Sequence, residues 1–420
     1  MTSVSGRPQD VEVLTFGCRL NLVESEAMRR TALACGRSNL VIVNTCAVTA
    51  EAARQARQAI RRIKRERPDA EIVVTGCAAQ IDPHRFAAMP EVFRVIGNAE
   101  KADPAVWAHG SARVDVSNIM AAKAAQTILS EGIEDHTRVF LAVQTGCDHR
   151  CSFCVIPFGR GPSRSVPMDE IFRAARRLSE KGFREIVLTG VDLTSYGADL
   201  CGAPKLGGLV KAILRAAPDL ARLRLSSIDC SEADEDLIAA FAGEARLMPH
   251  LHLSLQSGDD LILKRMKRRH GRTDAVRLCD GLRRLRPEIV FGADLIAGFP
   301  TETEAMFQNT LALVRDCGLT HLHVFPFSAR PGTPAAKMPP VAPQIVKARA
   351  KRLREAGDAA LRKHLEAQTG KVFRILTERG GTGRTEDFSR VNIGDHPPSQ
   401  MIEMVIAGND GKMLEAKVWA

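Results

Sequence analysis

The sequence lacks long hydrophobic runs. Its longest ones, such as Leu40–Val43 and Ile186–Leu188, have the length of buried β-strands, whereas a membrane-spanning helix needs about 20 apolar residues. The first ten residues, Met1–Asp10, are polar and contain no apolar stretch of the kind that a secretory signal requires. We therefore expect a cytoplasmic protein that does not enter a membrane.

Aromatic residues are also scarce, at 5% of the chain, with two tryptophans and one tyrosine. This scarcity argues against a platform on which the bases of single-stranded nucleic acid stack. Lysine and arginine, 59 in total, outnumber the 49 aspartates and glutamates, which gives a net charge of +10. Such an excess favours a polyanionic partner, nucleic acid first. Recognition would then rest on charge and shape.

A disulfide framework is not expected either. The chain has eleven cysteines, an odd number, and no secretion signal. In a reducing cytosol, cysteines bind metals, take part in redox chemistry or are simply buried. Five of them match no motif, and we interpret them as buried or incidental thiols. These are Cys35, Cys201, Cys230, Cys279 and Cys317.

The N-terminal part alternates short β-branched runs with helical patterns. The expected strands are Val11–Phe16, Leu40–Thr45, Glu71–Thr75 and Phe93–Ile96. The expected helices are Glu24–Cys35, Ala50–Arg67 and Pro83–Ala88. This alternation predicts a doubly wound α/β domain with a parallel sheet, which we assign to residues 9–118. The alanine-rich residues 98–137 are interpreted as a connecting segment that is partly helical.

Three of these strands lead directly into a cysteine. Cys18, Cys46 and Cys77 each follow the end of an expected strand. Sites in open α/β sheets form outside the carboxyl ends of the strands. We therefore expect the three thiols to converge on one edge of the sheet.

A second alternation of strands and helices begins at Val139. The expected strands are Val139–Gln144, Glu185–Val191, Leu223–Ile228, Leu251–Gln256, Val290–Ile296 and His321–Phe327. Six β/α units over about 190 residues predict a partial (β/α)6 barrel, because the eightfold barrel usually takes about 250. We assign residues 133–363 to it. Glycine and polar residues follow the strands, so a ligand is expected at the C-terminal mouth.

The C-terminal part changes character. Five prolines in Pro331–Pro343 indicate a connector, and a basic helix is expected over Gln344–Gln368. Beyond it, short alternating strands are broken by Gly380-Gly381 and Pro397-Pro398. This pattern predicts a small all-β barrel, which we assign to residues 366–420.

The most informative motif is a C-x3-C-x2-C run formed by Cys147, Cys151 and Cys154, directly after the first barrel strand. Zinc usually takes four ligands, often in separated pairs. Three thiolates in eight residues without an obvious fourth ligand favour an iron–sulfur cubane in which one iron is open. Zinc-bound or buried cysteines are the alternative. His149, in the same loop, is interpreted as a polar residue rather than a ligand.

This run, at the start of a partial barrel, resembles the radical S-adenosylmethionine superfamily. The sequence around the other triplet, in Thr15–Asn21, Asn44–Thr49 and Thr75–Cys77, resembles its methylthiotransferase branch. The last fifty residues are similar to a TRAM domain, a small RNA-binding barrel. Within the branch, His252–Gly258 and His323–Pro334 resemble most the group that acts on threonylcarbamoyladenosine in tRNA.

The resemblance implies two 4Fe–4S clusters. Cys147, Cys151 and Cys154 would hold the one that binds S-adenosylmethionine and yields a 5′-deoxyadenosyl radical, while Cys18, Cys46 and Cys77 would hold an auxiliary one carrying the sulfur to be inserted. The six cysteines are thus the implied catalytic and metal-binding residues. A second S-adenosylmethionine would methylate the sulfur, and a flavodoxin- or ferredoxin-like protein would supply electrons. The product would be methylthiolated at C2 of the adenosine at position 37 of tRNA.

Five residues at strand exits are candidates for holding S-adenosylmethionine, although each could equally serve a turn or packing. They are Gly190, Ser226, Gln256, Ile296 and Gly298. The loop that contains Gly298 departs from the branch, because Thr301 stands where the branch usually has glycine. The change could alter how closely the backbone approaches the nucleoside, although we expect cofactor binding to survive.

Three basic surfaces are candidates for contacting tRNA, although a charged run is usually only a solvated face. They are the helix face with Arg54, Arg57, Arg61 and Arg65, the run Lys264–Arg272, and the helix Gln344–Lys371 that leads into the C-terminal barrel. The barrel is the strongest candidate. Alternative functions are methylthiolation of isopentenyladenosine in tRNA or of a ribosomal-protein aspartate, and a non-catalytic iron–sulfur RNA-binding protein.

Overall fold

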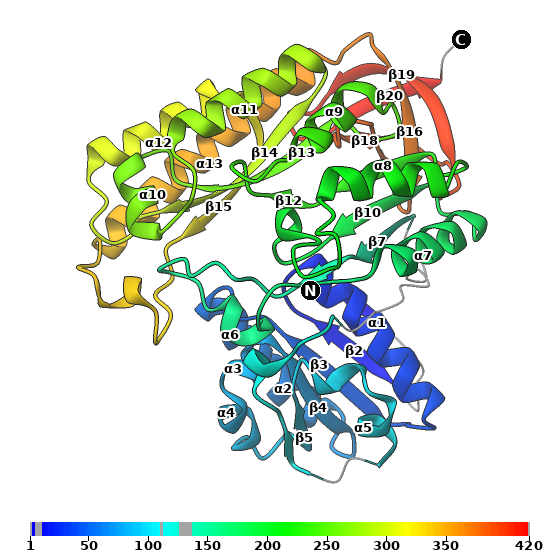
Figure 1. Ribbon diagram of the computed structural model, residues 1–420, viewed down its shortest axis with the longest axis vertical. Helices are drawn as coiled ribbons and strands as arrows, with labels where there is room; N and C mark the ends of the chain where they lie inside the picture. Colours follow the sequence, from blue (N-terminus) through cyan, green and yellow to red (C-terminus); the bar gives the residue numbers. More distant parts are fainter. Residues whose placement is uncertain (1, 5–10, 110–111, 126–136, 419–420) are drawn as a thin grey trace.

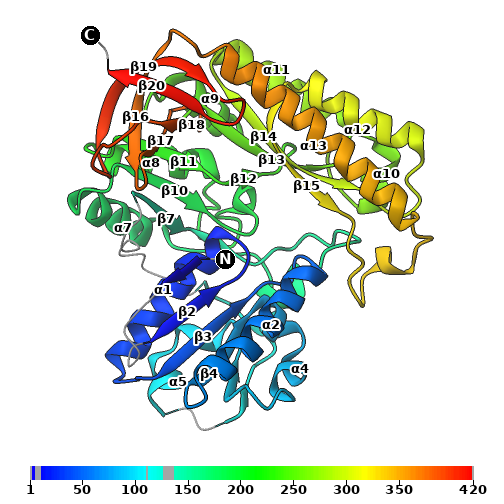
Figure 2. The same cartoon turned by 180° about the vertical axis from the view of Figure 1, so that it is seen from behind.

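The computed structural model describes residues 2–4, 11–109, 112–125 and 137–418. Figure 1 shows three parts that follow one another along the chain, namely an N-terminal α/β part, a large curved sheet with outer helices, and a small C-terminal β-barrel. The N-terminal part and the small barrel lie at opposite ends of the curved sheet in both views (Figures 1 and 2). The predicted α/β class is confirmed. No helix in the described ranges has the length and hydrophobicity that a membrane crossing requires.

The N-terminal sheet has six strands in sequential order, β1 antiparallel to β2 and the others parallel. The strands are β1 Thr2–Val4, β2 Glu12–Thr15, β3 Leu40–Thr45, β4 Glu71–Gly76, β5 Arg94–Ile96 and β6 Val114–Asp115. The helices are α1 Arg19–Ala34, α2 Ala50–Glu66, α3 Cys77–Ile81, α4 Pro83–Ala87 and α5 Pro104–His109, with 3-10 turns at Glu100–Ala102 and Ile119–Ala121.

Helices cover both faces of this sheet. Met28 and Ala32 of α1 pack on one face, and Ile60 and Ile63 of α2 pack on the other. Because β2, β3 and β4 follow in sequential order, the crossovers through α1 and α2 must have opposite hands, which is uncommon. Thr49 caps α2 by accepting a hydrogen bond from the Ala52 amide.

Two details of the N-terminal part differ from the expectation. Helix α1 begins at Arg19 rather than Glu24, so the residue after Cys18 is already helical. The connecting segment contributes the edge strand β6 as well as helical turns, because two residues suffice to pair with β5. Residues 126–136 of that segment lie outside the described residues.

The curved sheet contains the six parallel strands of the predicted partial barrel. Their order is β7, β10, β11/β12, β13, β14 and β15, where β11 and β12 are two parts of the third strand. Their bounds are β7 Arg138–Ala142, β10 Glu185–Thr189, β11 Arg222–Leu225, β12 Ser227–Ile228, β13 His250–Gln256, β14 Val290–Ala297 and β15 Leu319–Pro326. The third strand is interrupted at Ser226, which divides it into β11 and β12. A short ladder pairs β8 Gln144–Thr145 with β9 Arg164–Ser165.

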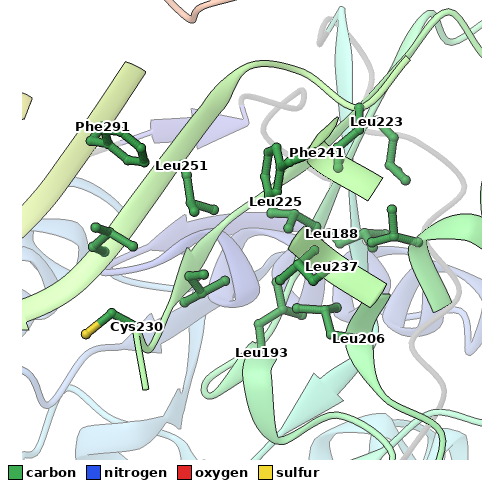
Figure 3. Close-up of a cluster of buried hydrophobic side chains, with 14 of the residues drawn as sticks. Leu188, Leu193, Leu206, Leu223, Leu225, Cys230, Leu237, Phe241, Leu251 and Phe291 are labelled. Carbon is green, nitrogen blue, oxygen red and sulfur yellow. The ribbon is translucent and has the colours of Figure 1, made fainter. Parts of the chain in front are cut away.

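Helices pack on the outer face of this sheet (Figures 1 and 2). They are α7 Met168–Glu180, α8 Leu206–Ala216, α9 Glu235–Gly243, α10 Asp260–Met266, α11 Arg272–Leu285, α12 Glu304–Asp316 and α13 Pro343–Glu366, with 3-10 turns at Leu193–Ser195 and Pro334–Lys337. Helix α6 Ile156–Arg160 packs instead against α3 of the N-terminal part. Figure 3 shows the core between them, where Leu223 and Leu225 of β11 meet Leu237 and Phe241 of α9. Apolar residues alternate with polar ones along the strands, so the concave face is polar.

The C-terminal residues form the predicted closed barrel, in the strand order β16-β17-β18-β20-β19. Its strands are β16 Val372–Glu378, β17 Thr382–Arg384, β18 Arg390–Asn392, β19 Met401–Asn409 and β20 Leu414–Val418. The small barrel docks on the N-terminal ends of the large barrel's strands, where Arg222 donates to the Arg384 carbonyl at 3.1 Å and Arg224 to the Glu386 carbonyl at 3.1 Å. It therefore lies opposite the mouth at the C-terminal ends.

Candidate functional site

The first three cysteines stand at the carboxyl ends of three adjacent parallel strands. Cys18 is the N-cap of α1 just beyond β2, Cys46 follows β3, and Cys77 opens α3 directly after β4. Cys18 is exposed, whereas Cys46 and Cys77 are buried. Because β2, β3 and β4 are parallel neighbours in one sheet, their carboxyl ends bring the three thiols of this N-terminal triplet to one edge.

Local packing explains two of the residues that accompany the N-terminal triplet. Gly17 has φ +99°, and a Cβ there would lie 2.7 Å from both Cβ and Sγ of Cys46, so only glycine fits. The buried Asn21 side chain donates to the carbonyls of Phe16 at 2.7 Å and Thr45 at 3.1 Å. These bonds tie the start of α1 to the end of β3 and hold the two cysteine loops together.

The second triplet lies in the loop between β8 and α6, at the C-terminal mouth of the partial barrel. Its thiols face a cavity of about 170 Å³, which β12, β13 and the residues after β10 also line. Cys147, Cys151 and Cys154 are all half-buried. We call these three residues the barrel triplet.

A short helix connects the two triplets. Helix α6 begins two residues after Cys154, and its Arg160 donates a hydrogen bond from Nε to Cys77 Sγ at 3.0 Å. Gly159 lies so close to α3 that a Cβ would be 3.2 Å from the Cys77 carbonyl and Cβ. Helix α6, which follows the barrel triplet, therefore packs directly against Cys77 of the N-terminal triplet.

Arg160 is held by a buried ionic network. Its guanidinium binds both carboxylate oxygens of Glu24, one of them at 2.8 Å, and Lys101 Nζ lies 2.6 Å from the same carboxylate. Burial opposes ionisation of Glu24, but Arg160 and Lys101 outweigh it and lower its pKa to about 2. Glu24 on α1 therefore holds the Arg160 guanidinium in place beside Cys77.

Charged side chains surround the barrel triplet. The sequence patterns did not single them out as a set. Cys147 Sγ donates to Asp192 Oδ2 at 3.5 Å, and Arg268 donates to Cys151 Sγ at 3.7 Å and to Asp229 Oδ2 at 2.6 Å. His149 Nε2 lies 2.9 Å from Asp192 Oδ2, and the carboxylates of Asp192 and Glu232 raise the pKa of His149 to about 10. Asp192 and Asp229 both follow strand ends, which is the signal that locates them.

The five candidate cofactor residues lie at different places around the mouth. Gln256 lines the cavity with φ +69°, an unusual conformation that is often found at functional sites. Ser226 adjoins the cavity residue Ser227, and its hydroxyl is buried without a hydrogen-bond partner among the described residues. Gly190 precedes the cavity residues Val191 and Asp192 and packs on Gln144.

The remaining two candidates do not line this cavity. Ile296 packs with Phe299 and Ile262 in a small apolar cluster, and Gly298 lies against Val346 of α13. The loop after Gly298 contains Thr301 at φ +68°. A β-branched residue rarely adopts this conformation, which explains why glycine suits the position. The Thr301 hydroxyl compensates in part by accepting from Arg265 at 2.8 Å.

The donor chemistry fits iron–sulfur clusters. All six cysteines are free thiols, each group supplies three of them, and thiolates are the usual ligands of such clusters. Burial raises the pKa of Cys46 to about 12 and that of Cys154 to about 11. Both are therefore neutral until a metal replaces the proton.

The basic surfaces considered for RNA divide into two kinds. Arg54, Arg61 and Arg65 on α2 are exposed. In the run Lys264–Arg272, by contrast, the Arg268 side chain is only 8% exposed and faces the barrel triplet, so the interpretation of this residue as a surface contact was wrong. Its position after α10 places it in the cavity.

The five cysteines outside the triplets are not part of this site. Cys230, Cys279 and Cys317 are buried in the core of the large sheet, Cys35 is half-buried, and Cys201 is exposed.

Comparison with known proteins gives two family matches. The Radical SAM superfamily matches residues 141–314, and a group described as "Uncharacterized protein family UPF0004" matches residues 10–97. Among solved structures, the chain is similar to the radical S-adenosylmethionine methyltransferase TsrM from Kitasatospora setae, with a TM-score of 0.55 and 17% identity over 75% of this chain and 69% of that one. The fold and the cysteine loop together are those of radical S-adenosylmethionine enzymes.

Curated relatives extend the match to nearly the whole chain. The chain is 48% identical to threonylcarbamoyladenosine tRNA methylthiotransferase MtaB of Rickettsia prowazekii, over 91% of both chains. It is 37% identical to MtaB of Thermotoga maritima, over 88% of this chain and 86% of that one. It is 34% identical to tRNA-2-methylthio-N(6)-dimethylallyladenosine synthase of Cereibacter sphaeroides, over 97% of this chain and 95% of that one. The chain belongs to the radical S-adenosylmethionine methylthiotransferase family, and it is a transferase.

Proposed function

We propose that this protein adds a methylthio group to C2 of N6-threonylcarbamoyladenosine at position 37 of tRNA. Of these curated relatives, the one with 48% identity is named for threonylcarbamoyladenosine. The observation that most supports a methylthiolation reaction is the hydrogen bond from Arg160 to Cys77, because it joins the helix that follows the barrel triplet to a cysteine of the N-terminal triplet. A reaction that inserts sulfur at an unreactive aromatic carbon needs both a radical source and a sulfur carrier.

In this proposal Cys147, Cys151 and Cys154 hold one 4Fe–4S cluster, and Cys18, Cys46 and Cys77 hold the other. With S-adenosylmethionine bound, a cluster held by Cys147, Cys151 and Cys154 would supply radical chemistry able to remove the hydrogen from C2. Gln256 and Ser226 are the best placed of the candidate residues to orient S-adenosylmethionine, since one lines the cavity and the other has an unpartnered buried hydroxyl.

The chain's own residues orient the components and exclude water. Asp192 beside Cys147 and Arg268 beside Cys151 line the same cavity, so a polar ligand bound there would meet an acidic and a basic side chain. Helix α1 packs Leu20 and Val23 against Phe140 and Val187. This apolar contact seals the side of the barrel that faces the N-terminal sheet, where a reactive radical must be kept from solvent.

Each domain has its own role in this proposal. We propose residues 9–118 as the sulfur-carrying domain, 133–363 as the radical domain and 366–420 as an RNA-binding barrel of the TRAM type. The small barrel lies far from the mouth, at the other end of the strands, so it would hold the body of the tRNA while the anticodon region enters the mouth. The exposed arginines of α2 lie on the domain that bears the N-terminal triplet. The reaction takes place in the cytoplasm with its tRNA, and an external flavodoxin- or ferredoxin-like protein supplies electrons.

The test is mass spectrometry of nucleosides from bulk tRNA of cells with and without the gene. We expect the 2-methylthio derivative of threonylcarbamoyladenosine to disappear and its precursor to accumulate. An unchanged nucleoside profile would contradict the proposal, and the search would then turn to a ribosomal-protein substrate.

A second candidate substrate is N6-dimethylallyladenosine, because the Cereibacter sphaeroides relative at 34% identity is named for it. Loss of that nucleoside's methylthio form in the same experiment would establish this substrate and leave the chemistry unchanged.

A further inference from the structure

Arg19 directly follows Cys18 and is the first residue of α1. Its guanidinium carbon lies 5.8 Å from the centre of the Phe140 ring. Phe140 belongs to β7 of the partial barrel and packs with Leu20 of α1 and Val187 of β10. Arg19 therefore extends from the N-terminal triplet towards the concave face of the barrel.

Arg19 has no counter-ion among the described residues, because none of their carboxylates lies within ion-pair distance of it. The two carboxylates whose negative charges act on Arg19, those of Glu185 and Asp294, are already paired with other residues. Glu185 receives two hydrogen bonds of 3.1 Å from Arg224, and Asp294 lies 3.0 Å from His252 Nε2 and 3.1 Å from His323 Nδ1. The half-buried guanidinium is thus surrounded by groups whose charges are satisfied.

Leaving the half-buried Arg19 guanidinium without an anionic partner costs free energy. The Arg19 side chain is half-buried against Phe140, and none of the described carboxylates pairs with it. Desolvated cations in proteins normally have an anionic partner. A bound anion would therefore remove an existing penalty, and the ring of Phe140 beneath the guanidinium would keep its planar face in place.

The proposed substrate carries an anion in its N6 group. The threonylcarbamoyl group ends in a free carboxylate, whereas the dimethylallyl group is an apolar hydrocarbon. C2 of the adenine must approach the sulfur carried at the N-terminal triplet, and Arg19 is the direct neighbour of Cys18. A guanidinium binds a carboxylate through two parallel hydrogen bonds, which gives both strength and orientation.

We propose that Arg19 binds the carboxylate of the threonylcarbamoyl group and selects substrates with an acidic N6 substituent. The inference rests on the proposed function, since it names the group of that substrate which this chain recognises. Arg19 is then a substrate-binding residue that determines specificity.

The experiment compares two anticodon stem–loops with the loaded enzyme. One carries threonylcarbamoyladenosine, and the other carries the same nucleoside with its carboxylate converted to the primary amide. The variants are Arg19→Gln, which removes the charge, Arg19→Lys, which keeps it, and Arg277→Gln as a control at an exposed arginine on α11. Iron content and the spectra of both clusters are measured for each variant, because Arg19 adjoins a proposed ligand.

We expect the wild-type enzyme to prefer the acid over the amide by about tenfold or more in kcat/KM. Arg19→Gln should lower kcat/KM for the acid by about ten- to a hundredfold, the range for a hydrogen bond to a charged group, and should leave the amide unchanged. Arg19→Lys should be intermediate, and Arg277→Gln should behave as wild type. Dissociation constants of the two stem–loops, measured without turnover, should follow the same order.

Equal losses on both stem–loops would overturn the proposal, because Arg19 would then support the cluster or contact a phosphate common to both. An unchanged acid-to-amide ratio in Arg19→Gln would overturn it as well. In both cases the wild-type enzyme still modifies the acid, so the proposed function stands. If the wild-type enzyme modified only a dimethylallyl stem–loop, the proposed function would fail, and this inference with it.

Discussion

Arg160 Nε donates a hydrogen bond to Cys77 Sγ over 3.0 Å, although the two residues are 83 positions apart in the sequence. Arg160 ends the five-residue helix α6, which starts just after the barrel triplet, and Cys77 follows the third cysteine-bearing strand of the N-terminal sheet. One short helix thus sets the position of one triplet relative to the other. Hydrogen bonds to cluster sulfurs also tune reduction potentials.

We expect Arg160→Gln to make the potential of the cluster at the N-terminal triplet more negative, by on the order of 50 mV, the equivalent of about 1 kcal/mol for one electron. A positive hydrogen-bond donor stabilises the reduced, more negative cluster, and its removal withdraws that stabilisation. The measurement is a redox titration followed by electron paramagnetic resonance.

The matched control is Arg164→Gln, four residues further on. Arg164 is also buried but donates to the Arg160 carbonyl rather than to a cysteine. Equal shifts in the two variants would show that the hydrogen bond to Cys77 has no special effect.

Iron content tests the assignment of two clusters. Two cubanes give about eight iron atoms per chain, so we expect about four in Cys77→Ala and about four in Cys154→Ala. Only Cys154→Ala should lose the cleavage of S-adenosylmethionine. Cys201→Ala, at an exposed cysteine, should keep all the iron. A Cys77→Ala protein with the full iron content would refute the assignment of the N-terminal triplet.

Thr301 provides a test of backbone strain. A non-glycine residue in the left-handed region is strained by about 1–2 kcal/mol, and β-branching makes this worse. We expect Thr301→Gly to have a free energy of unfolding about 1–2 kcal/mol higher than Thr301→Val, since both lose the hydroxyl that accepts from Arg265 and only glycine relieves the strain. Denaturant unfolding measures the difference. Equal stability of the two variants would argue against strain at φ +68°.

The buried carboxylate of Glu185 makes the free energy of unfolding depend on pH in the acidic range. Burial opposes its ionisation, but Arg224, Arg138 and Arg222 outweigh this and lower its pKa to about 2, compared with about 4.3 when unfolded. A lowered folded-state pKa stabilises the fold above the unfolded pKa, and this stabilisation is lost as the pH falls from about 4.3 to about 2. The amount is about 3 kcal/mol.

We therefore expect Glu185→Gln to be clearly less stable than wild type at pH 7 and the difference to narrow as the pH falls below 4. Because the two proteins share every other acid, the comparison isolates Glu185. A difference that stayed constant from pH 7 to pH 3 would contradict the lowered pKa of Glu185 in the folded protein.

Much of the fold was predictable because its periodicities are strong. Strands that alternate with helices, and the runs that precede Cys18, Cys46 and Cys77, indicated the sheet and its cysteine edge. The pattern predicts the start of α1 five residues too late, because Cys18 supplies no side-chain cap and Arg19–Val23 is not distinctly amphipathic. Arg19 therefore does not stand out in the sequence.

The partners of the cysteines could not be read from the sequence. Arg160, Arg268 and Asp229 reach their places through long-range contacts between elements, and local patterns carry no information on such contacts. Arg268 in particular lies in a basic run that resembles a solvated surface. Asp229 could have been found by the rule that sites follow strand ends.

The most direct test of methylthiolation uses purified, anaerobically loaded enzyme with S-adenosylmethionine, sulfide, a reductant and a stem–loop that contains threonylcarbamoyladenosine. Mass spectrometry of the digested RNA should show the 2-methylthio nucleoside for the wild-type enzyme. Cys77→Ala should give none of it while still cleaving S-adenosylmethionine. Cleavage of S-adenosylmethionine by the wild-type enzyme without any methylthio product on this stem–loop would contradict the proposed substrate, and full product from Cys77→Ala would contradict the role of the N-terminal triplet.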